Sequence, residues 1–147
     1  MRALALMSLV LAAAACGTEK PRGVEIVAAP GGDVPAVVVR ELARAHRDGR
    51  QLLVYVGAPW CEPCRRFHQA AAEHKLDQAF PRLRLLEFDD DRDAARLAMA
   101  GYTSKFIPLF ARPNPDGRGS GRQIEGSVKG DGAVNEIIPR LRTLLAP

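Results

Sequence analysis

The stretch GAPWCEPC, residues 57–64, contains two cysteines separated by two residues. It overlaps the end of an apolar run, QLLVYVGA (51–58), of the kind that forms a central strand buried on both faces. Apolar residues then recur at helical spacing up to about Lys75. The pattern therefore places Cys61 at a strand-to-helix junction, with Cys64 one helical turn further along.

A cysteine at the start of a helix is well placed to ionise. Unpaired backbone N–H groups and the helix dipole favour a negative charge there, which lowers the pKa of a thiol and makes it reactive. Pro63 suits the first helical turn, because its missing N–H is not needed there. We therefore expect Cys61 to be an exposed nucleophile that attacks a disulfide of a partner, and Cys64 to resolve the mixed disulfide.

Other uses of the cysteine pair have less support. A permanent disulfide between Cys61 and Cys64 would close too small a loop to stabilise the fold. His68 lies four residues after Cys64, so the three side chains could together bind copper. A structural zinc site needs four ligands, however, and no second cysteine pair is present. Arg65 follows Cys64 directly, which excludes the CxxCH motif of covalent haem attachment. We expect no resident metal.

Strands and helices alternate along the rest of the chain. We expect strands at 24–29, 51–58, 82–89, 105–112 and 122–128, and helices at 34–48, 61–75, 92–102 and 134–145. This order predicts parallel pairing among the early strands and an antiparallel hairpin near the end. An α/β fold follows, with a mixed central sheet of four to five strands and helices on both faces. Four phenylalanines are expected in the core: Phe67, Phe80, Phe88 and Phe106.

Two motifs together resemble the thioredoxin superfamily, namely WCEPC after an apolar strand and FIPLF at 106–110. The resemblance covers residues 24–146. It implies a thioredoxin fold and a thiol–disulfide oxidoreductase whose cysteine pair is the redox centre, so that no cofactor is needed. It also implies that Pro108 is in the cis form and faces the cysteines. Ile107 would then contribute backbone contacts to the substrate, and Trp60 would shape the surface of the site.

The chain departs from the cytoplasmic members of that superfamily in its acidic residues. Tyr55 stands six residues before the first cysteine, where those proteins carry a buried aspartate that accepts the proton of the resolving thiol. Leu85 stands at the approximate position of the lysine beside that aspartate. Another group must therefore take the proton, either Glu62, water or a carboxylate elsewhere in the chain. Glu62 and Pro63, between the cysteines, are expected to modulate the pair.

The first 16 residues, MRALALMSLVLAAAAC, have the pattern of an export signal. Arg2 supplies a positive start, and the apolar stretch that follows is shorter than the roughly 20 residues needed to cross a bilayer. A buried N-terminal helix is the alternative. We expect a signal peptide at residues 1–15.

The ending AAAC resembles the lipobox of bacterial lipoproteins, which implies that Cys16 becomes the lipidated first residue of the mature protein. Thr18 is not the aspartate that marks retention at the inner membrane, so an outer-membrane destination is favoured. The competing interpretation is plain cleavage around Ala13 and Ala15 without lipid. We expect a lipidated N-terminus and tether at 16–23, and one thioredoxin-like domain at 24–147.

The composition suits one globular domain of 147 residues, with 47% hydrophobic and 26% charged residues. The formal net charge is only +4, and the basic residues are scattered rather than concentrated with aromatic ones. A nucleic-acid footprint would need a denser basic patch. We therefore expect no nucleic-acid partner, and we expect a monomer.

These observations favour an exported thiol–disulfide oxidoreductase, anchored by lipid on the periplasmic side, that exchanges disulfides with other exported proteins through Cys61 and Cys64. The alternative is an extracytoplasmic binding protein for copper or an apocytochrome, with little turnover. Glu62 resembles the residue between the cysteines of the extracytoplasmic thioredoxin-like reductases of cytochrome c maturation. Those proteins carry an insertion for which the spacing from Cys61 to Pro108 leaves no room.

Overall fold

The computed structural model describes residues 23–147 of the chain. The predicted signal peptide, the predicted lipidation site at Cys16 and nearly all of the predicted tether lie outside the described residues. The elements are β1 (Glu25–Ala28), α1 (Val34–Arg47), β2 (Gln51–Gly57), α2 (Glu62–Ala72), β3 (Leu83–Asp89), α3 (Asp90–Met99), β4 (Leu109–Pro113), β5 (Gly119–Glu125) and α4 (Ala133–Leu145).

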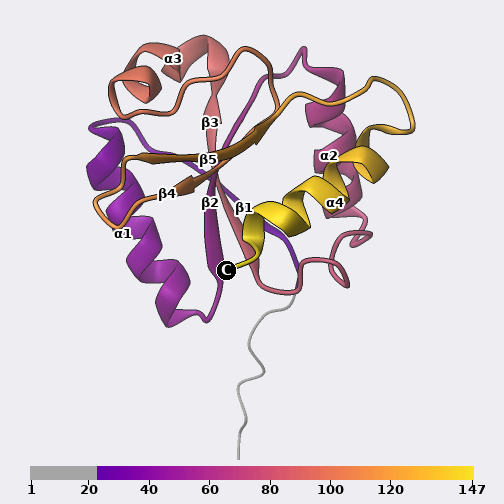
Figure 1. Ribbon diagram of the computed structural model, residues 1–147, viewed down its shortest axis with the longest axis horizontal. Helices are drawn as coiled ribbons and strands as arrows, with labels where there is room; N and C mark the ends of the chain where they lie inside the picture. The colour runs from indigo at the N-terminus through magenta and orange to yellow at the C-terminus, as the bar shows by residue number, and fades with distance from the viewer. Residues whose placement is uncertain (1–22) are drawn as a thin grey trace, which may run out of the picture.

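The five strands form one mixed sheet in the order β1-β3-β2-β4-β5 (Figure 1). β1 and β2 pair in parallel with β3, whereas β4 pairs antiparallel with both β2 and β5. The central strands β2 and β3 are almost wholly buried, as expected of apolar strands covered on both faces. The mixed α/β sheet predicted from the order of elements is confirmed.

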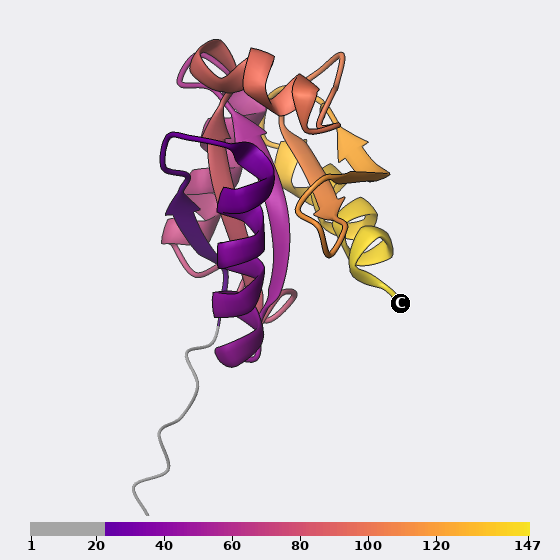
Figure 2. The same cartoon turned by 90° about the vertical axis from the view of Figure 1, so that its left-hand side faces the viewer.

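Helices cover both faces of the sheet, which gives three layers (Figures 1 and 2). α1 and α3 pack on one face, where Val38, Phe88 and Leu97 belong to one apolar cluster. α2 and α4 pack on the other face, where Phe67 and Ile137 belong to a second cluster. Only residues 58–61 separate the end of β2 from the start of α2. Because both elements are packed into the layers, the position of this short segment is fixed.

Several predicted elements differ from those observed at their ends. β5 spans Gly119–Glu125 instead of 122–128, and α3 spans Asp90–Met99 instead of 92–102. β4 begins at Leu109 rather than at residue 105, because Pro108 has no N–H to donate to a sheet and the preceding residues form a loop. α2 ends at Ala72 rather than at Lys75, and His74 beyond it has a positive φ of 59° that a continuing helix cannot contain.

Phe106 lies in the loop before β4 and is 65% exposed, so the prediction that it belongs to the core is wrong. The other three phenylalanines expected there are buried. Without a strand at 105–108, no sheet face directs the Phe106 side chain inward.

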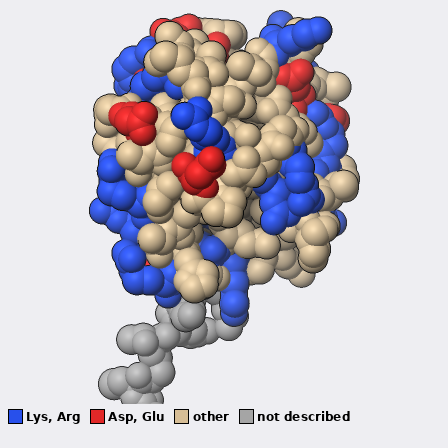
Figure 3. All heavy atoms as spheres, turned by 60° about the vertical axis from the view of Figure 1, so that its left-hand side comes forward, with Lys and Arg blue, Asp and Glu red and all other residues tan. Residues whose placement is uncertain are grey.

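On the face drawn in Figure 3, basic side chains lie in separate groups with acidic and uncharged ones between them. None of the helices within residues 23–147 has the length and apolar character needed to span a membrane.

Candidate active site

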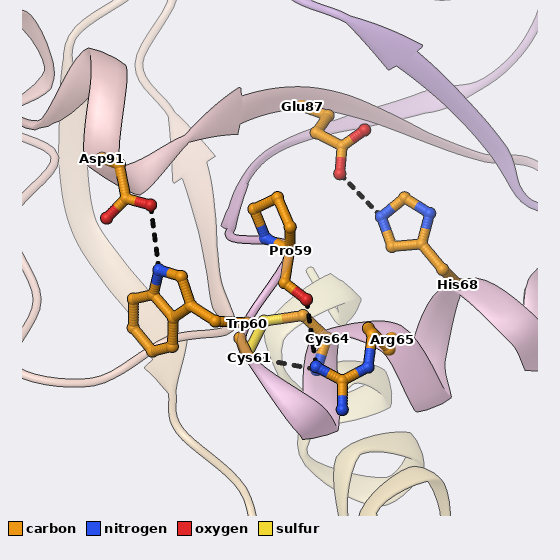
Figure 4. Close-up of a disulfide and its surroundings, with 8 residues drawn as sticks. All are labelled: Pro59, Trp60, Cys61, Cys64, Arg65, His68, Glu87 and Asp91. Carbon is orange, nitrogen blue, oxygen red and sulfur yellow. Dashed lines mark hydrogen bonds and ion pairs between the residues drawn. A yellow bond between two sulfur atoms is a disulfide. The ribbon is translucent and has the colours of Figure 1, made fainter.

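Cys61 and Cys64 form a disulfide at the junction of β2 and α2, with 5.2 Å between their Cα atoms (Figure 4). Cys61 is the N-cap residue of α2, and its Sγ accepts a hydrogen bond from the backbone N–H of Cys64 at 3.2 Å. Pro63 is buried in the first turn, where no N–H is required. The predicted placement of the pair at a helix N-terminus is confirmed.

Both cysteines are buried in this oxidised form. Cys61 is 4% exposed and Cys64 is 2% exposed, so the expectation of an exposed Cys61 is wrong here. Ala58 and Ile107 pack against the disulfide and cover it. The two residues nevertheless border different spaces. Cys61 lines a surface groove, whereas Cys64 lines a separate cavity.

The groove beside Cys61 has a volume of about 820 Å³, and both apolar and charged side chains line it. Trp60 and Val128 are 62% and 53% exposed along it, together with the exposed Phe106. Apolar side chains left in water beside a reactive group are typical of binding surfaces. No pattern in the sequence indicates Val128, whereas Phe106 could have been found from its position next to the Ile-Pro pair.

Ile107 lines this groove, and the peptide bond that joins it to Pro108 is cis, as the sequence predicts. The backbone N–H of Gly126 donates to the carbonyl of Pro108 at 2.9 Å and so joins β5 to the same surface. Gly126 has a positive φ of 64°, and a Cβ on it would lie 3.1 Å from the Cβ of Phe106. A glycine therefore lets this loop pass under the phenylalanine.

The segment before the disulfide is fixed by two side-chain hydrogen bonds (Figure 4). The indole N–H of Trp60 donates to Oδ2 of Asp91 on α3 at 2.9 Å. The guanidinium of Arg65 donates to the carbonyl of Pro59 at 3.0 Å. Together they hold the cysteine loop between two helices, which keeps the disulfide in one position relative to the groove.

Comparison with known proteins agrees with this geometry. A family model described as thioredoxin-like matches residues 36–115, which include both cysteines and Pro108. The chain belongs to the thioredoxin-like family. It is also similar to the crystal structure of oxidised thioredoxin O1 from Arabidopsis thaliana, with 18% identity, a TM-score of 0.48, and coverage of 84% of this chain and 95% of that one. Among curated protein sequences, none matches this chain significantly.

Within this thioredoxin-like fold, Glu62 lies on the groove side of the cysteines. Its Oε1 accepts a hydrogen bond from the backbone N–H of Gly130 at 3.2 Å and lies 3.8 Å from the guanidinium of Arg66. Arg66 in turn pairs with Asp131 at 3.1 Å. Glu62 therefore ties α2 to the loop between β5 and α4, and it does not line the cavity beside Cys64.

That cavity has a volume of about 560 Å³ and contains the residue that replaces the buried acid of thioredoxins. Tyr55 is fully buried, and burial, together with the charge of Glu87, raises the pKa of its phenol far above the ordinary value. The residue paired with Tyr55 on β3 is Glu87, not Leu85, which packs in the core. The sequence-based placement of Leu85 beside Tyr55 is therefore wrong, and a carboxylate occupies that place instead.

The arrangement is that of a redox centre. A disulfide at a helix N-terminus yields on reduction a thiol whose ionised form the helix favours. Fold, family and cysteine pair make this chain a thiol–disulfide oxidoreductase. Within residues 23–147, no three His, Cys, Asp or Glu side chains are gathered closely enough to hold a metal ion.

Proposed function

We propose that this protein exchanges disulfides with exported protein substrates, with Cys61 as the attacking thiol. The observation that supports this most is the groove that Cys61 lines together with the exposed apolar side chains of Trp60 and Phe106. An extended peptide in the groove would bury its apolar side chains there. Its sulfur would then lie beside Cys61, while Cys64 stays on the other side of the loop.

The exchange takes place in two balanced steps. In the reduced protein, the Cys61 thiolate attacks one sulfur of the substrate disulfide, which forms a mixed disulfide and releases one substrate thiol. The Cys64 thiolate then attacks the sulfur of Cys61, which forms the intramolecular disulfide and releases the second substrate thiol. Two electrons pass from the dithiol to the substrate, and the reverse order of steps oxidises a substrate dithiol.

Reduction of insulin disulfides by dithiothreitol tests this function. We expect the wild-type protein to accelerate the reaction and Cys61→Ser to reduce the rate to that without protein, because no sulfur remains on the groove side. Precipitation of the released insulin chain gives the rate directly. Wild-type protein that is no faster than Cys61→Ser would contradict the proposed activity.

We also propose that the protein acts outside the cytoplasm, held at a membrane by lipid on Cys16. The support is the sequence of residues 1–16, with its positive start, short apolar stretch and terminal cysteine. More than one acyl chain is needed for stable anchoring. Mass spectrometry of the mature N-terminus is expected to show a chain that begins at Cys16 and carries acyl groups. A mature chain with an unmodified N-terminus would refute the anchor.

A further inference from the structure

The cavity beside Cys64 raises the question of which group takes the proton of the resolving thiol. Cys64 has to lose that proton before it can displace a substrate from Cys61. Glu62 is held on the groove side of the loop by Gly130 and Arg66. The acceptor therefore has to be sought among the residues that share the cavity with Cys64.

Tyr55 lies in this cavity but cannot be the acceptor. Its phenol stays protonated because burial raises its pKa, so its oxygen does not take up the proton of a thiol. Among the described residues this buried hydroxyl has no hydrogen-bond partner. A Cβ on Gly57 would lie 2.9 Å from the hydroxyl oxygen, so glycine at this position leaves room for the ring. A buried donor of this kind at a cavity wall can hold a water molecule.

His68 and Glu87 form the pair that can accept a proton there. Nε2 of His68 lies 2.6 Å from Oε1 of Glu87, and the two side chains point toward one another from α2 and β3 (Figure 4). Both line the cavity with Cys64, and the His68 ring packs 5.7 Å from the Tyr55 ring. A neutral imidazole beside a carboxylate gains one proton to become an ion pair, which the short contact stabilises.

The other charged groups around the cavity are already engaged. Arg65 donates to a backbone carbonyl of its own loop, and Arg92 pairs with Asp93 on α3. Asp89 accepts the backbone N–H of Arg92 as the N-cap of α3. The His68–Glu87 pair therefore differs from the other charged groups lining the cavity, because its two members bind one another across two elements.

We infer that the His68–Glu87 pair, acting through water in the cavity, accepts the proton of Cys64 in the resolving step. The inference rests on the proposed exchange function. In the step, the Cys64 thiol gives its proton to the pair, and the resulting thiolate attacks the Cys61 sulfur. The bond from Cys61 to the substrate sulfur breaks, the substrate leaves as a thiolate, and the pair returns the proton to it. In thioredoxins, the carboxylate that accepts this proton lies on the strand before the cysteines. In this chain, Glu87 on β3 supplies the carboxylate instead.

An aromatic disulfide whose thiolate is coloured separates the two steps. Reduced protein is mixed with a stoichiometric amount of 5,5′-dithiobis(2-nitrobenzoate), and each released thiolate is followed by absorbance between pH 6 and pH 9.5. The first release reports the attack by Cys61 and the second reports the resolution by Cys64. We expect Glu87→Gln to leave the first phase unchanged and to slow the second about 100-fold at pH 6.5, the lower end of what a positioned base contributes.

The pH profile distinguishes loss of the base from distortion. In Glu87→Gln and in His68→Gln, the second rate should rise about tenfold per pH unit, because hydroxide has to remove the proton. Above about pH 8.5, the ordinary pKa of a thiol, these variants should approach the wild-type rate since Cys64 then ionises without help. A second phase equal to that of wild type at every pH, or slowed equally at every pH, would overturn the inference.

Matched controls lie just beyond the C-terminal end of α2. His74 forms a similar pair with Asp77 at 2.9 Å but is exposed and does not line the cavity, and Glu73 is an exposed carboxylate. His74→Gln and Glu73→Gln should leave both phases unchanged, and a slowed second phase in either would overturn the assignment to His68 and Glu87. Wild-type protein that shows neither phase would refute the exchange function itself.

Discussion

Cys64→Ser is expected to arrest the reaction at the mixed disulfide, with the substrate bound covalently to Cys61. In the wild-type protein, Cys64 lies next to Cys61 in the first turn of α2, where an intramolecular thiol reaches an effective concentration on the order of 10⁵ M or more. An external thiol at millimolar concentration cannot match this. Release of the substrate should therefore slow by a factor of at least about 10³, even after allowance for imperfect geometry.

Non-reducing electrophoresis and mass spectrometry after incubation with a disulfide-containing protein detect the trapped complex. Cys61→Ser is the matched control, because it keeps one thiol but leaves it facing the cavity rather than the groove. We expect no complex with Cys61→Ser and a stoichiometric complex with Cys64→Ser. A complex that forms equally well with both variants would refute the division of roles that the two different lining surfaces indicate.

The local part of the site could be predicted from the sequence. The spacing of Cys61 and Cys64 and the apolar strand before them place the pair at a helix N-terminus. The motif around Pro108 adds the cis bond, which the structure contains. These features depend on neighbours within a few residues, or on a motif long enough to be specific. They can therefore be predicted from the sequence without knowledge of the tertiary structure.

The nonlocal part could not be predicted. Glu87 reaches the cavity because β2 and β3 pair in a register that sets it beside Tyr55, and a shift of two residues would have placed Leu85 there instead. Such a register depends on the packing of whole strands. Phe106 likewise has the composition of a core residue, but the end of the strand at Pro108 leaves it in solvent.

The disulfide therefore has two chemically different sides. The groove side is apolar at Trp60 and Phe106, which suits the burial of a peptide. The cavity side holds Tyr55, His68 and Glu87, which suits the movement of a proton. Because Cys61 borders the first and Cys64 the second, a mutation on one side should affect one step of the exchange.

Arg84→Met is expected to destabilise the fold by about 3–5 kcal/mol, the cost of leaving buried charges without their partner. Arg84 on β3 is 9% exposed, and its guanidinium contacts Glu25, Glu41 and Asp48. Glu41 is itself only 8% exposed, so the loss of the arginine leaves a buried carboxylate with the exposed Arg44 as its remaining ion-pair partner. Urea unfolding followed by circular dichroism measures the loss as a lower midpoint with an unchanged slope.

The double variant Arg84→Met/Glu41→Leu separates the charge effect from packing. Replacement of a buried ion pair by apolar residues of similar size is often neutral, so the second substitution should restore most of the lost stability. Arg40→Met, on the exposed surface of α1, should change the free energy of unfolding by less than about 0.5 kcal/mol. If the double variant were less stable than Arg84→Met, packing of the arginine stem rather than compensation of Glu41 would be the main contribution of Arg84. Because Arg84 lies near the start of β3 and the disulfide follows the end of β2, the folded variant should keep its rate of insulin reduction at 25 °C.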